Sequence, residues 1–168
     1  MEAVLLTGVF GVGKSTVAAE IADLLEGVGV PYAAIDLDWL TWCNVGSPDL
    51  RNGDAVLPRN LASVMGNYAD AGVRYFVLAL SVRDQDQLDI LADTVAMPLY
   101  VVELVVSLDE IKGRLGTDPT TGRRDDLAET IAWIEQGHGT GFADHVVDNT
   151  RPVRVVATDI LQRLAWPS

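Results

Sequence analysis

Short apolar runs alternate along the chain with segments in which apolar residues recur at helical spacing. The runs that predict strands cover residues 2–8, 32–38, 73–80, 99–106 and 145–148. Helical spacing predicts helices after residue 14, over 58–71 and 83–95, after 107, around 127–134 and after 152. Repeated strand–helix units of this kind form a parallel sheet with helices on both faces. The pattern therefore predicts an α/β fold.

Polar residues and prolines mark where several of these elements begin or end. Ser107 and Glu110 form a capping-box pattern, in which Ser107 accepts from an early helical N–H and Glu110 reaches back. Pro152 can begin the last helix. Residues 116–124 are rich in Gly, Pro, Thr and Asp, which predicts a loop between two helices.

Length and composition limit the class of protein. The 168 residues, 49% of them apolar, are enough for one core, so we expect a single domain over residues 1–168. No apolar run approaches the roughly 18 residues of a membrane-spanning helix, and the first residues lack the basic region of a secretory signal. The single cysteine, Cys43, cannot form an internal disulfide. These features favour a soluble, cytoplasmic protein without a membrane partner.

The net charge of −12 argues against nucleic acid as a partner, because it repels polyanions and no basic stripe interrupts it. An anionic ligand would need a local binding device. Residues 8–15, GVFGVGKS, match G-x-x-x-x-G-K-[ST] between a predicted strand and a predicted helix. Glycines let several N–H groups converge on one anion, and the helix N-terminus adds its dipole.

This P-loop (residues 8–15) predicts a nucleoside triphosphate site. Lys14 can reach the β- and γ-phosphates, and the Ser15 hydroxyl can bind Mg²⁺. A turn that only links a strand to a helix would not require Lys-Ser after its last glycine. The predicted nucleotide contacts are Gly8, Gly11, Val12, Gly13, Lys14, Ser15 and Thr16.

With the P-loop, the segments IDLDWL, PLYVVELVVSLDEIKGRL and HVVDNTRPV occur in an order that resembles the P-loop small-molecule and nucleotide kinases. The pattern is most similar to the shikimate, gluconate and adenylylsulfate kinase branch. The resemblance covers nearly the whole chain and implies a three-layer fold with a five-stranded parallel sheet in the order 2-3-1-4-5. It also implies phosphate binding at the carboxyl ends of the strands.

Asp36 and Asp38 form a DxD pattern at the end of the second predicted strand. In the resembling kinases the first acid supports Mg²⁺ through water, and the second binds the acceptor hydroxyl and can act as a base. The resemblance assigns these roles to Asp36 and Asp38, although one of them could instead cap the following helix. The third strand ends in Ser81, where many P-loop proteins have an acid. Either Asp36 is then the main carboxylate near the metal, or Ser81 and Arg83 contact the acceptor.

The resembling kinases close an arginine-bearing lid over the triphosphate, and residues 114–126 occupy that position. Arginine stabilises the charge that phosphoryl transfer spreads over the phosphate oxygens. Arg114, Arg123 and Arg124 are therefore candidate catalytic residues, although at least one of them could be only a solvated charge. A further likeness, to the adenine-binding segment, assigns nucleotide contacts to Asn149, Arg151 and Pro152. Asn149 or Thr150 could also cap the last helix.

Residues 38–60 are expected to bind the acceptor. Trp39 and Trp42 lie three positions apart, so on a helical turn they would share a face and could stack on a ring, or they could be core residues. Arg51 and Arg59 could bind an anionic acceptor.

Together these features predict an ATP- and Mg²⁺-dependent phosphotransferase that acts on a hydroxyl of a small metabolite, as a monomer or homodimer. A nucleoside or nucleotide kinase and an antibiotic-modifying kinase are alternatives within the same chemistry. A regulatory module that binds nucleotide without catalysis is an alternative of a different class.

Overall fold

The computed structural model describes residues 1–43, 56–116, 121–136, 139 and 141–168, and the side chains of 116, 121–126 and 129 are outside this description. Within these residues five parallel strands form one sheet in the order β2-β3-β1-β4-β5. The strands are β1 (Glu2–Thr7), β2 (Tyr32–Asp36), β3 (Tyr75–Ala79), β4 (Leu99–Val105) and β5 (His145–Asp148). The expected fold class and strand order are confirmed.

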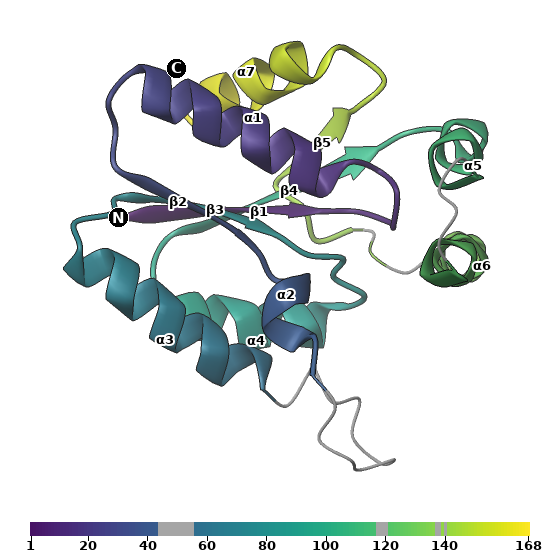
Figure 1. Ribbon diagram of the computed structural model, residues 1–168, viewed down its shortest axis with the longest axis horizontal. Helices are drawn as coiled ribbons and strands as arrows, with labels where there is room; N and C mark the ends of the chain where they lie inside the picture. Colours follow the sequence, from purple (N-terminus) through teal and green to yellow (C-terminus); the bar gives the residue numbers. More distant parts are fainter. Residues whose placement is uncertain (44–55, 117–120, 137–138, 140) are drawn as a thin grey trace.

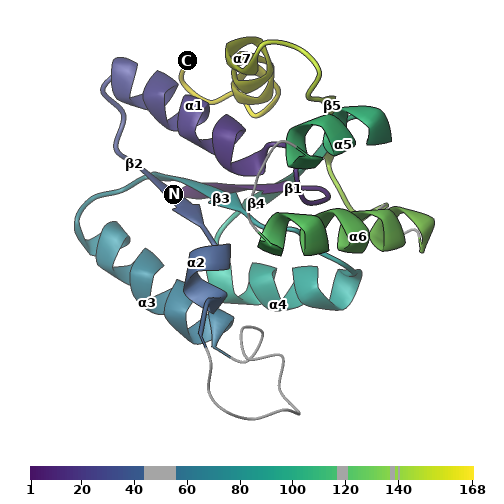
Figure 2. The ribbon, with the colours of Figure 1, turned by 45° about the vertical axis from the view of Figure 1, so that its right-hand side comes forward.

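Helices cover both faces of the sheet (Figure 1). One face carries α1 (Lys14–Gly27) and α7 (Val153–Arg163), and the other carries α3 (Leu57–Asp70) and α4 (Gln85–Val95). The short helix α2 (Asp38–Thr41) follows β2 almost directly. Figure 2 shows α5 (Leu108–Gly116) and α6 (Thr121–Glu135) side by side beyond the carboxyl ends of the strands. The carboxyl ends of the parallel strands β1, β2 and β4 therefore lie at the same end of the sheet, where α2, α5 and α6 are also found.

The continuous apolar runs of the central strands reflect burial on both faces. In β1, Val4 and Leu6 pack into the core beneath α1 and α7, whereas Ala3 and Leu5 pack into the core against α3 and α4. Burying one such large side chain contributes about 1.5–3 kcal/mol. The two cores fix β1, and with it the start of the P-loop, in the middle of the molecule.

Helix ends partly follow the sequence predictions. The Ser107 hydroxyl accepts from the Glu110 N–H at 3.2 Å, as the capping-box pattern predicts. The Glu110 carboxylate lies 3.2 Å from Nε of Arg114, one turn along α5, instead of forming the predicted bond back to residue 107. In α6, the apolar spacing indicated Ile134, which is 46% exposed, whereas the neighbouring Trp133 is buried. Thr121 already lies in α6, so the predicted loop is shorter than its composition indicated.

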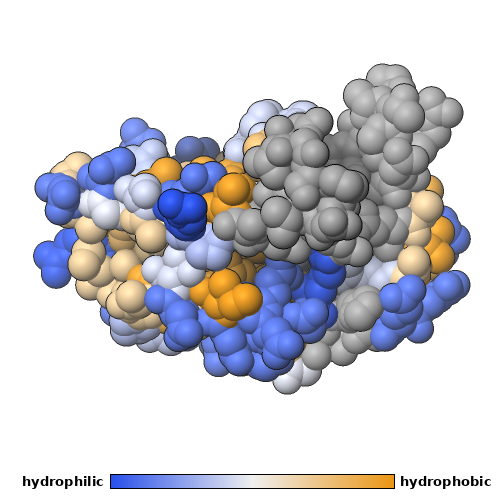
Figure 3. Space-filling model, turned by 90° about the horizontal axis from the view of Figure 1, so that it is seen from below, coloured by the Kyte–Doolittle hydropathy of each residue, from blue (hydrophilic) through white to orange (hydrophobic). Residues whose placement is uncertain are grey.

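The face that α3 and α4 present to solvent is mainly hydrophilic where the structure describes it, with small apolar areas between (Figure 3). Leu88 and Leu91 of α4 are buried against the sheet, while Ile90 is 54% exposed. In the described part of the chain, no helix combines the length and the apolar character needed to cross a membrane.

Candidate active site

The P-loop lies tightly against its surroundings. Gly8 and Gly13 have φ angles of 128° and 104°, in the region that glycine adopts without strain. A Cβ at Gly8 would lie 2.5 Å from the carbonyl oxygen of Leu104 in β4, so a side chain there would displace the loop. Gly13 directly precedes α1, and the first N–H groups of that helix are available to an anion.

Lys14 is 8% exposed and its ammonium group lies over the loop. Nζ donates to the carbonyl oxygens of Gly8 and Val9, both at 3.1 Å, and to Oγ of Ser81 at 2.8 Å. It also lies 5.5 Å from the centroid of the Phe10 ring. These three oxygens carry no full charge, so the negative charge of a phosphate would attract the ammonium group more strongly than they do. The ammonium group is thus held where an anion in the loop can attract it.

Ser15 and Asp36 meet at the start of α1 and the end of β2. The Ser15 hydroxyl donates to Oδ2 of Asp36 at 2.6 Å, and Oδ1 of Asp36 accepts from the backbone N–H of Asp38 at 3.1 Å. A hydroxyl and a carboxylate beside a phosphate loop are the oxygen ligands that suit Mg²⁺. The two residues predicted to hold the metal are therefore in contact.

Arg114 and Asn149 hold the P-loop from outside. The carbonyl oxygen of Val12 accepts from Nη1 of Arg114 at 2.8 Å and from Nδ2 of Asn149 at 2.7 Å. Nη2 of Arg114 also donates to the Asn149 carbonyl at 3.1 Å. We call these three residues the loop clamp. Asn149 is 6% exposed and its side chain supports the loop, while its predicted contact with the nucleotide stays a prediction.

An open cavity of about 710 Å³ lies in front of the P-loop. It brings together residues that the sequence indicated for four different roles. They are Gly11, Gly13, Lys14, Ser15, Thr16, Asp36, Asp38, Trp39, Trp42, Arg114, Asn149 and Arg151. Three other predicted nucleotide contacts have structural roles here. The Gly8 carbonyl accepts from Lys14 and the Val12 carbonyl accepts from Arg114. Pro152 is the N-cap residue of α7.

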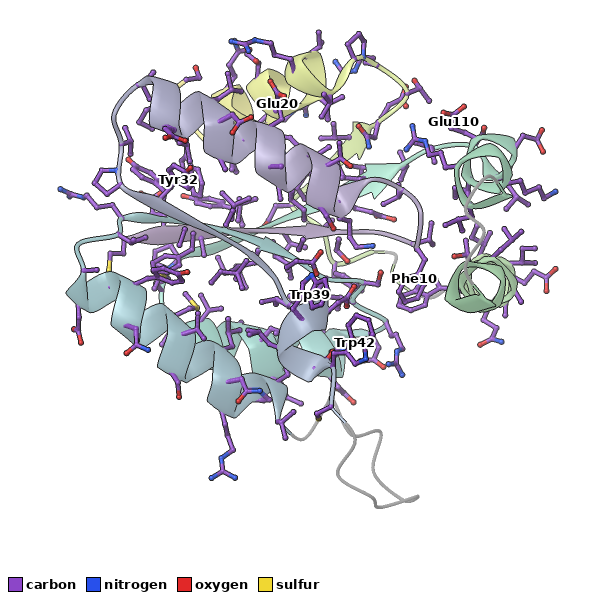
Figure 4. The ribbon with its side chains drawn as sticks, in the orientation of Figure 1. Phe10, Glu20, Tyr32, Trp39, Trp42 and Glu110 are labelled. Carbon is purple, nitrogen blue, oxygen red and sulfur yellow. The ribbon has the colours of Figure 1, made fainter. Side chains whose placement is uncertain are left out.

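Trp39 and Trp42 are surface residues, which excludes the alternative that they belong to the core. They are 69% and 78% exposed, and their rings lie 5.1 Å apart at an angle of 35°. Figure 4 shows both at α2, on the same end of the sheet as Phe10 of the P-loop.

Other predicted residues lie apart from this cavity. Arg59 is exposed on α3 and does not line it. Arg83 lines a separate hollow of about 230 Å³ between α3 and α4, because the preceding Val82 is buried and its own N–H is fixed by Gln87. Arg51 lies outside the described residues. Arg123 and Arg124 belong to α6, with side chains outside the description.

The structure adds contacts that the sequence did not indicate. Ser81, which stands where many P-loop proteins have an acid, bonds to Lys14. Phe10 occupies a position at which the P-loop motif accepts any residue. Its ring centroid lies 6.2 Å from that of Trp133 of α6, and the two ring planes are 86° apart. The Phe10 carbonyl also accepts from the buried hydroxyl of Thr130 at 3.4 Å. Aromatic character at an open motif position was the only available signal.

Two carboxyl groups near this edge have shifted pKa values. Hydrogen bonds from Arg163 and Arg151 lower the pKa of Asp159, and they hold Arg151, which lines the cavity, through a 2.8 Å contact. Burial raises the pKa of Glu103 in β4. Its neighbours Val102 and Leu104 pack under α1 and α7, so Glu103 points to the opposite face of the sheet.

The strand order and the P-loop between β1 and α1, with its lysine and serine, define the P-loop kinase fold. No protein-family model matches the chain, and no curated protein matches it. Solved structures do. A sugar kinase from Janibacter sp. HTCC2649 is 23% identical with a TM-score of 0.70, over 98% of this chain and 95% of that one.

Two further solved structures have the same architecture. A gluconokinase from Sinorhizobium meliloti 1021 is 22% identical, with a TM-score of 0.61 over 98% of this chain and 91% of that one. The APS kinase of Mycobacterium tuberculosis, solved in complex with AMPPNP and APS, is 17% identical, with a TM-score of 0.66 over 98% and 97%. At these identities the likeness establishes the fold, and it agrees with the branch that the sequence resembles.

Proposed function

We propose that the chain, as one domain over residues 1–168, is an ATP- and Mg²⁺-dependent phosphotransferase that moves the γ-phosphoryl group to a hydroxyl of a small molecule. The observation that carries the proposal is the single cavity that contains Lys14, the Ser15–Asp36 pair and Asp38. A phosphate-binding loop alone would support nucleotide binding. A second carboxylate in the same cavity, outside the P-loop, supports transfer to an acceptor.

Different residues of the cavity bind the phosphates, the metal and the acceptor in this proposal. The P-loop N–H groups and Lys14 bind the phosphates, and the loop clamp keeps the loop in its curved form. Ser15 and Asp36 would hold Mg²⁺, which neutralises phosphate charge and orients the triphosphate. Asp38 lies in the cavity where it can orient the acceptor hydroxyl and take its proton. Arg123 and Arg124, at the start of α6, are proposed to complete the lid over residues 114–126.

The relatives in fold support the small-molecule acceptor, since two of them are titled a sugar kinase and a gluconokinase. The complex of the APS kinase with AMPPNP supports binding of an adenine nucleotide. We also propose that the protein acts in the cytoplasm.

The test separates binding from transfer. Calorimetry should show binding of Mg²⁺-AMPPNP, and Lys14→Ala should weaken it by at least about tenfold, because phosphate loses its charged partner. A panel of hydroxylated metabolites should yield ADP with at least one member. Asp38→Asn should then lower turnover by about 10²-fold or more while nucleotide affinity stays within about threefold.

A non-catalytic nucleotide-binding module gives a different pattern. Such a protein would bind Mg²⁺-AMPPNP and release ADP at background with every acceptor, and Asp38→Asn would change nothing. Equal affinity of the wild type and Lys14→Ala for the nucleotide would contradict both functions.

A further inference from the structure

Trp39 and Trp42 form an exposed aromatic surface that nucleotide binding at the P-loop does not explain. Large apolar side chains exposed to this degree are uncommon and often mark a binding surface. The two indoles are 69% and 78% exposed, contact each other at 5.1 Å, and line the same cavity as Lys14 and Ser15. They also follow Asp38 closely in α2 and at its end (Figure 4).

Charge is unevenly distributed across this cavity. Its described cationic residues are Lys14 at the P-loop, Arg114 of α5 and Arg151 after β5. Lys14 bonds to loop carbonyls and to Ser81, Arg114 bonds to Val12 and Asn149, and Arg151 bonds to Asp159. Since β2 and β5 lie at opposite edges of the sheet, the described cations lie on the β1, β4 and β5 side.

The β2 side is different in character. Among the described lining residues, it contributes the carboxylates Asp36 and Asp38 and the two indoles. A bound triphosphate together with its Mg²⁺ would still add net negative charge. An acceptor with a carboxylate or phosphate would therefore meet repulsion here. Indole faces attract a cation or stack on an uncharged ring, and carboxylates attract a cation or accept from hydroxyl groups.

Building on the proposed function, we propose that Trp39 and Trp42 bind the acceptor and that this acceptor is a hydroxylated ring compound without negative charge, such as a sugar or an amino sugar. One ring face would stack on the indoles. Its hydroxyls or ammonium group would face Asp38, with one hydroxyl directed toward the P-loop. This substrate class differs from the gluconate and APS acted on or bound by two of the relatives in fold.

Compounds that share a ring system but differ in charge test the proposal. Glucosamine, glucose and glucuronate differ in charge on the same skeleton, and adenosine and AMP form a second series. Affinity is measured by calorimetry with the protein saturated with Mg²⁺-AMPPNP. We expect the cationic or neutral member of at least one series to bind about tenfold more tightly than its anionic member.

Variants locate the binding. The double variant Trp39→Ala/Trp42→Ala should weaken that probe by about tenfold, whereas Trp39→Phe/Trp42→Phe should retain affinity within about threefold. Tyr68→Ala, which removes a 43% exposed ring on α3, serves as the matched control and should have no effect. Mg²⁺-AMPPNP affinity should be unchanged in all three.

The outcomes are distinct. Tighter binding of glucuronate or AMP, no binding by any probe, or full affinity in the double alanine variant would each overturn this proposal. If Mg²⁺-AMPPNP still binds in those cases, the proposed function stands. If the wild type fails to bind Mg²⁺-AMPPNP, the proposed function itself is wrong.

Discussion

Individual residues in the cavity are held by specific hydrogen bonds. Lys14 is the clearest example: a buried ammonium group bonded to two carbonyls and the hydroxyl of Ser81. Burial of a charge is costly unless hydrogen bonds satisfy it. Ser81 thus has a defined place in the site, which supplies an uncharged partner where an aspartate would form an ion pair with the lysine.

Glu103 is the residue at which pH dependence is expected. Burial raises the pKa of its carboxyl, so the folded state keeps the proton to higher pH than the unfolded state does. Stability is then lost as pH rises through the raised pKa, and the loss is complete above it. Glu103→Gln removes this cost and should raise the Tm at neutral pH, on the order of 2–4 °C, with a smaller gain near pH 4.

The measurement is thermal unfolding of both proteins across this pH range. Glu135→Gln, at an exposed position on α6, is the control and should give a constant difference. A gain for Glu103→Gln that is larger in acid than at neutral pH would show that the sign is wrong.

At the level of elements, the loop clamp connects three segments that are far apart in the sequence. It joins the P-loop to α5 through Arg114 and to the end of β5 through Asn149, with the Val12 carbonyl as the shared acceptor. A Cβ at Gly13 would lie 2.7 Å from Nδ2 of Asn149, so the close approach also requires glycine.

Asn149→Ala should therefore weaken Mg²⁺-nucleotide binding by about three- to tenfold. It removes one of two donors to the Val12 carbonyl and leaves space beside Gly13, a loss of about 0.5–1.5 kcal/mol for the hydrogen bond. Asn149→Asp should be worse, because a carboxylate would then face a carbonyl oxygen.

Calorimetry with AMPPNP measures the effect, and Asn67→Ala, at an exposed position on α3, is the matched control. Nucleotide affinity equal to that of the wild type in both Asn149 variants would show that the clamp does not support the loop.

At the scale of the whole molecule, the net charge of −12 opposes the ligand that the P-loop is expected to bind. Long-range repulsion between like charges is screened over about 30 Å at 0.01 M salt and about 8 Å at 0.15 M. The local contacts at Lys14 are short and partly buried, so salt screens them less. Association of Mg²⁺-ATP should accordingly become faster with added salt, by less than about tenfold.

Stopped-flow fluorescence between 0.01 and about 0.2 M potassium chloride would measure this rate. A rate that falls with salt would show that the local positive field extends beyond the cavity and dominates the approach.

The sequence predicted the fold and the position of the phosphate-binding loop, for identifiable reasons. Residues 8–15 form a contiguous motif whose geometry is local, and the strand patterns reflect burial on two faces. The P-loop motif predicted Ser15 as a metal ligand and the family resemblance added Asp36, and the two side chains are in contact.

Contacts between distant segments could not be predicted in the same way. The Asn149 side chain supports the P-loop from 137 positions away, and no local spacing encodes that distance. Arg59 and Arg83 lie outside the main cavity, because sequence proximity to the acceptor region does not fix the direction of a side chain. For the tryptophans, the same spacing fitted both core and surface, and only their exposure decided between them.

Phe10 is shared by two parts of the site, since its ring lies below the Lys14 ammonium and also contacts Trp133 of α6. An anion that draws the ammonium away from this ring would remove a contact on one side of Phe10 and leave the helix on the other side. The position of α6 and the affinity of the loop would then be thermodynamically coupled, and such coupling is reciprocal. A molecule that bound only to α6 and shifted it would thereby alter how tightly the phosphates are retained.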